Sequence, residues 1–94
     1  MATPSLATDD ALTPASDSLQ AAYFRGVLAD QRALIAAEIA TQTRRLSFLS
    51  AKTDSLAITR LRRVIRHNEA EHRSLDRMIE ALERRFARHW ANQP

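Results

Sequence analysis

Apolar positions recur with a helical period over most of the chain, and the pattern is most regular from residue 58 onward. There they step alternately by three and four residues, which is the spacing of a coiled-coil heptad seam. Neither glycine nor proline occurs from Val27 to Gln93, so neither helix-breaking residue interrupts this stretch. We therefore predict a helix over about 55–91. Its seam, which we expect to be an association surface, comprises Ile58, Leu61, Ile65, Asn68, His72, Leu75, Ile79, Leu82 and Phe86.

An earlier periodic segment predicts a first helix over about 18–49, with Ser16 or Asp17 as its N-cap. The apolar stripe of this helix contains Leu28, Ile35, Ile39, Leu46 and Leu49, and Gln42 falls in the same stripe. The neighbouring positions Tyr23, Phe24, Val27 and Leu34 are expected to widen this apolar face toward the N-terminal end.

The two stripes are out of phase with one another, which places a turn between them. Leu49 and Ile58 lie nine residues apart, whereas one unbroken seam would need seven, ten or eleven. The polar run at about 50–54 supplies the turn. We predict an all-α antiparallel hairpin of two long coiled-coil-like helices over residues 17–92, with facing residue numbers that sum to about 107. Because a lone pair of helices leaves apolar surface exposed to water, the hairpin is expected to form a homodimer, a four-helix bundle.

Residues 1–16 are rich in Ala, Thr, Ser, Pro and Asp and show no apolar period. This composition predicts a disordered N-terminal tail. The first twenty residues contain no Lys or Arg and no apolar run, which disfavours a targeting peptide. No stretch approaches the roughly 18 apolar residues of a membrane span, so we expect a cytoplasmic protein.

The net charge of +3, from 14 basic and 11 acidic residues, is distributed unevenly. Positive charge concentrates between residues 44 and 66, where Asp54 is the sole acidic residue. A hairpin brings these residues to one end, which predicts contact with an anionic partner, either an acidic protein surface or a nucleic-acid backbone. This basic cluster consists of Arg44, Arg45, Lys52, Arg60, Arg62, Arg63 and Arg66.

These features predict a small non-enzymatic adaptor that self-associates and uses no cofactor. The chain has no cysteine, no glycine-rich phosphate loop and no spacing typical of a catalytic triad. Nucleic-acid binding is the first alternative. We expect it to be without sequence specificity, because no helix-turn-helix or zinc-finger pattern occurs. In architecture the predicted dimer resembles the Rop-type RNA-binding bundle.

A second alternative is a metal site. Glu69 and His72 have the Glu-x-x-His spacing of helical di-iron bundles, and Glu38 lies across the predicted hairpin. Here the chain resembles two-helix ferritin-like proteins such as encapsulated ferritins. That resemblance implies iron bound by Glu38, Glu69 and His72 on dimerisation, with ferroxidase-like activity. The chain departs from the family at 42–45, where polar and basic residues replace an aromatic pair.

Overall fold

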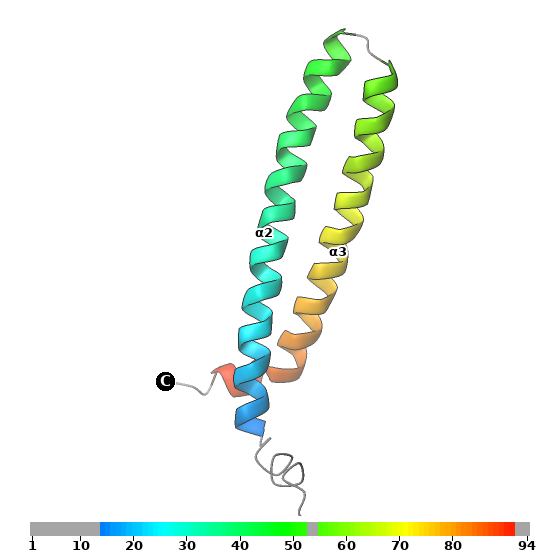
Figure 1. Ribbon diagram of the computed structural model, residues 1–94. Coiled ribbons are helices and arrows are strands. Elements are labelled where there is room, and N and C mark those ends of the chain that lie inside the picture. The colour runs from blue at the N-terminus through cyan, green and yellow to red at the C-terminus, as the bar shows by residue number, and fades with distance from the viewer. Residues whose placement is uncertain (1–13, 53–54, 92–94) are drawn as a thin grey trace, which may run out of the picture.

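The protein is a hairpin of two long helices. A computed structural model describes residues 14–52 and 55–91, in which Pro14–Lys52 forms helix α2 and Ser55–Ala91 forms helix α3. The two helices run side by side from a closed end near Lys52 and Ser55 to an open end, where the last turns of α3 bend and cross α2 close to its first turns (Figure 1). The predicted all-α hairpin is confirmed. Neither of these helices has the length and apolar character needed to cross a membrane.

The bounds of α2 differ from the prediction at both ends. The helix begins at Pro14, so residues 14–16 of the expected tail are helical, and neither Ser16 nor Asp17 is its N-cap. Proline suits the first helical turn because its missing N–H would have no intrahelical acceptor there, and Asp17 in this turn favours the helix dipole. Residues 50–52 of the expected turn also belong to α2, while Ser55–Ala91 matches the second predicted helix. Positions 1–13 and 53–54 lie outside the described residues.

The core lies between the two helices and joins both predicted stripes. Leu28 and Ile35 of α2 pack against Leu75 and Ile79 of α3, and Ile79 is only 3% exposed. Burying one such side chain contributes about 1.5–3 kcal/mol relative to leaving it in water. The α3 seam therefore faces α2 of the same chain, and its buried members are Ile65, Asn68, Leu75, Ile79 and Phe86.

Polar contacts across the core fix the register of the hairpin. Asn68 Nδ2 donates to Gln42 Oε1 at 2.9 Å, which joins two of the polar residues that interrupt the stripes. Closer to the open end, Arg32 Nη1 lies 2.7 Å from Asp76 Oδ1. All these partners fall within a few positions of the predicted register.

Trp90 closes the open end of the hairpin. Its indole Nε1 donates to the backbone carbonyl of Ser18 at 3.0 Å, and its ring stacks on Phe86 at a centroid distance of 6.0 Å. The Arg25 guanidinium lies 5.5 Å from the centroid of the same indole. These contacts tie the last turn of α3 to the first turns of α2.

One expectation about α2 is wrong. Tyr23, Phe24, Val27 and Leu34 do not extend the inner apolar face, because they are 77%, 50%, 42% and 71% exposed. Val27 and Leu34 each directly precede a residue of the buried stripe. One residue turns the helix by about 100°, which carries both side chains away from α3.

Candidate functional site

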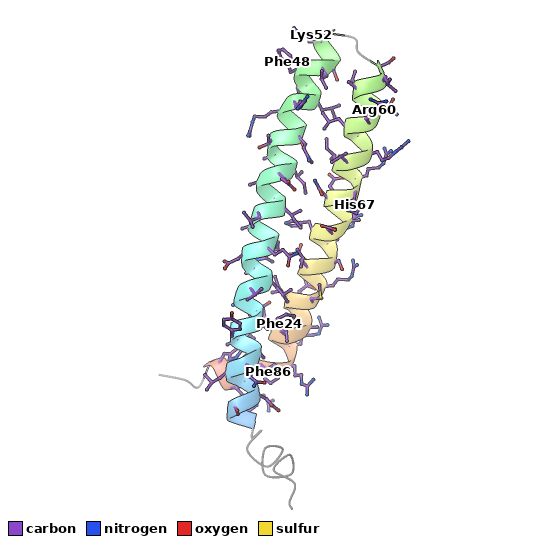
Figure 2. All side chains as sticks on the ribbon, viewed as in Figure 1. Phe24, Phe48, Lys52, Arg60, His67 and Phe86 are labelled. Carbon is purple, nitrogen blue, oxygen red and sulfur yellow. The ribbon has the colours of Figure 1, made fainter. Side chains whose placement is uncertain are left out.

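The basic cluster lies at the closed end of the hairpin. Arg44, Arg45 and Lys52 come from the last turns of α2, and Arg60 lies in the first turns of α3. Figure 2 shows Lys52 and Arg60 near the point where the chain passes from one helix to the other. All seven residues of the cluster are exposed: Arg44, Arg45, Lys52, Arg60, Arg62, Arg63 and Arg66.

The arginines of α2 outside the closed end form ion pairs within the fold. Arg25 and Arg32 of α2 form ion pairs with Glu83 and Asp76 of α3, so their charges are matched within the fold. Within the described ranges, no arginine of the basic cluster forms an ion pair. Arg44 Nη2 donates to the Thr41 hydroxyl at 3.2 Å, which leaves its charge unmatched. The arginines of the closed end therefore keep their positive charges for an external anion.

A shallow groove of about 270 Å³ lies within this end. Arg45 of α2 and Arg60 of α3 stand among its lining residues, and Val64, which is 44% exposed, is part of its apolar surface. The remaining lining residues are Leu49, Ala57 and Leu61. This arrangement suits a ligand that carries both negative charge and an apolar group.

Phe48 and Lys52 form an exposed edge at the same end. The Lys52 Nζ lies 4.7 Å from the centroid of the Phe48 ring, a cation–π distance, and Phe48 is 60% exposed. Figure 2 shows both residues close to the top of α2. Since Phe48 is the sole aromatic residue between positions 41 and 66, a row of stacked bases finds little support here.

The metal candidates are not brought together within one chain. Glu69 and His72 line a cavity of about 390 Å³ with Ala36, Ile39 and Arg73, but Glu38 is not part of that lining. Glu38 precedes Ile39 by one residue, about 100° around α2, and so lies on the other side of the hairpin. His72 Nδ1 instead lies 3.4 Å from Asp76 Oδ2. In residues 14–52 and 55–91, no group of three or more His, Asp or Glu side chains is arranged to hold a metal ion.

Sequence reasoning identified the arginines of the groove but missed its apolar surface. Val64 and Ala57 do not belong to the α3 seam, so the heptad pattern gave them no role. A helical projection combined with the predicted register would have placed Val64 beside Arg45, since both lie about one position outside the buried stripes.

Comparison with known proteins gives no relative from which to transfer a function. No family model matches the chain, and neither a curated protein nor a solved structure is similar to it.

Proposed function

We propose that this protein is a small, non-enzymatic cytoplasmic adaptor whose closed end binds an acidic protein segment. One observation carries the proposal: Arg45 and Arg60, from different helices, line an apolar groove at the end of the molecule where the described residues contain no carboxylate. Two guanidinium groups held on separate rigid helices suit carboxylates spaced along a peptide. The groove between them suits an apolar side chain of that same peptide.

Charge contacts and apolar contacts contribute to the affinity in ways that depend differently on salt. Each exposed arginine–carboxylate pair is worth about 0.5–1 kcal/mol and weakens as salt rises. Apolar surface buried against Leu49, Leu61 and Val64 adds about 25 cal/mol per Å² and is insensitive to moderate salt. The basic cluster also attracts the acidic segment before contact, which raises the association rate. An acidic segment with one or two large apolar residues is therefore the favoured partner.

A nucleic-acid backbone is the second candidate, favoured by the seven exposed basic side chains at one end. Such binding would depend on phosphate contacts alone and would fall steeply with salt. The groove argues for the peptide, because an apolar surface adds nothing to a phosphate contact.

We also propose that the hairpin self-associates into a four-helix bundle. Nine large apolar side chains of the described residues are exposed, six of them on α2, which is much for a chain of this size.

The proposal is tested by fluorescence anisotropy with a labelled peptide of glutamates and leucines. We expect the Arg45→Gln/Arg60→Gln variant to bind about tenfold more weakly than the wild type, since two charge contacts are lost. The matched control is Arg77→Gln/Arg84→Gln, which removes two exposed arginines of α3 outside the closed end. Equal loss in both variants would show a response to total charge and would rule out a site at the groove.

A further inference from the structure

The α3 seam is buried against α2 of the same chain, so a second copy of the chain has to bind a different surface of the hairpin. Leu75, Ile79 and Phe86 are at most 9% exposed in the single chain. Little of their surface is left for a partner. The apolar area that remains belongs to side chains outside the buried stripes.

Much of that area lies on one side of the open half of the hairpin. Phe24, Val27 and Leu34 of α2 turn away from the core in the same direction, as does Met78 of α3, which is 42% exposed. We call these four residues the open-half face. A groove of about 210 Å³ on this side, lined in part by Gln31, Leu75 and Met78, provides a recess for a protruding side chain.

Charges on α3 are arranged symmetrically around Met78. Glu71 precedes it by seven residues and Arg85 follows it by seven, so all three lie along one line of the helix. All three side chains are exposed. Glu71 Oε1 lies 3.3 Å from His67 Nε2, an exposed contact within one helix, and the Arg85 guanidinium lies 5.3 Å from the Phe86 ring. Neither has an oppositely charged partner on α2 among the described ion pairs.

The exposed apolar positions of α2 are centred at the same level of the hairpin as Met78. The Arg32–Asp76 ion pair sets the register, and this places Met78 opposite position 30 of α2. Position 30 falls within half a residue of the midpoint between Val27 and Leu34, which are also seven residues apart. A two-fold axis at this level places Val27 opposite the partner's Leu34 and Met78 opposite its own equivalent in the partner.

From this symmetry we infer that the open-half face binds a second copy of the chain, antiparallel and two-fold about Met78, with Glu71 of each copy paired with Arg85 of the other. The inference rests on the proposed self-association and specifies its surface. An antiparallel dimer also keeps the two basic closed ends at opposite ends of the assembly, whereas a parallel dimer would press like charges together. About 30 residues of α2 overlap with α2 of the second copy, so the whole contact, with the open-half face at its centre, is about 45 Å long and about 20 Å wide. This is enough for the roughly 800 Å² per partner of a stable interface.

Charge reversal with mixing tests the pairing directly. Glu71→Arg and Arg85→Glu, each alone, should dimerise about tenfold more weakly by sedimentation equilibrium, because each places two like-charged contacts in the interface. An equimolar mixture should restore association to near the wild-type level as a heterodimer. Within one chain these positions are about 21 Å apart along α3 and cannot rescue one another. Glu69→Arg, the same charge change on the other side of α3, should dimerise like the wild type.

A distance measurement tests the orientation without altering the face. The chain has no cysteine, so a spin label at Ser50→Cys reports on the closed end alone. The antiparallel dimer predicts that the two labels lie more than about 50 Å apart, whereas a parallel dimer predicts less than about 25 Å. A wild-type dimer with no rescue on mixing, or with the short distance, would overturn the inference while leaving self-association intact. A wild-type chain that stays monomeric would overturn both.

Discussion

The side-chain N–H of Asn68 Nδ2 donates to the side-chain oxygen Oε1 of Gln42 at 2.9 Å, linking the two helices through their interior. Asn68 is 8% exposed, so its amide depends on this partner more than on water. A shift of one residue in register would separate the two groups. The pair therefore specifies the register of the hairpin at some cost in stability.

A double-mutant cycle tests this role. Asn68→Leu alone should lower the free energy of unfolding by about 1–2 kcal/mol because Gln42 loses its partner, while Gln42→Leu/Asn68→Leu should be as stable as the wild type or more so. Urea denaturation at one fixed protein concentration gives the four values. Additive effects of the two substitutions would show that the amides do not interact.

The packing of the core predicts that substituting alanine for a buried and for an exposed leucine lowers stability by different amounts. Leu28→Ala removes a side chain that is 5% exposed and should lower the free energy of unfolding by about 2–4 kcal/mol. Leu56→Ala makes the same change at a position that is 60% exposed and should cost less than about 1 kcal/mol. Thermal denaturation followed by circular dichroism compares them. Similar losses in the two variants would contradict the observed packing.

Asp76 links the two helices near the middle of the hairpin. Its two oxygens lie 2.7 Å from Arg32 Nη1 and 3.4 Å from His72 Nδ1. Asp76→Asn should lower the free energy of unfolding by about 0.5–1 kcal/mol at low salt, since the ion-paired side chains are more than a third exposed. Unfolding in 1 M salt should reduce this difference through screening. A loss that does not change with salt would assign the effect to packing.

Trp90 predicts a local effect at the open end of the hairpin. Trp90→Phe keeps an aromatic ring against Phe86 but removes the N–H donated to the Ser18 carbonyl. Amides in the first turns of α2 should exchange with solvent faster, by an amount that corresponds to about 1 kcal/mol. His89→Ala, at an exposed neighbouring position, is the control and should leave their exchange unchanged.

Much of the fold follows from spacing alone. The 3–4 period from Ile58 onward predicts α3 and its buried face, because only one side of a helix with that period meets its partner. The sequence did not predict the start of α2 at Pro14, because the Ser, Thr and Pro content of residues 1–16 is typical of a tail. The hydrogen bond from Trp90 to the Ser18 carbonyl stabilises the first turns of the helix. The ion pairs of Arg25 and Arg32 require the exact register, which a hydrophobic period gives only to within a few residues.

The sequence predicted the charge of the candidate site but not its shape. Arg45 and Arg60 belong to a visible cluster in the sequence, yet the groove between them depends on which way Leu49 and Val64 project once the helices pack. A stripe pattern also assigns neighbouring apolar residues to the core by default. Leu34 shows the error: it adjoins the buried Ile35 in sequence but is 71% exposed.

The proposed function requires that the closed end prefer an acidic, partly apolar peptide to a nucleic-acid backbone. Its most direct test measures binding of a glutamate–leucine peptide and of a single-stranded DNA of equal charge to the wild-type protein, each from 50 to 300 mM salt. We predict that the peptide binds more tightly at 150 mM salt and with the shallower salt dependence, because the groove adds a contribution that salt does not screen. Tighter binding of the DNA, with both affinities falling equally steeply, would contradict the proposal and favour the nucleic-acid alternative.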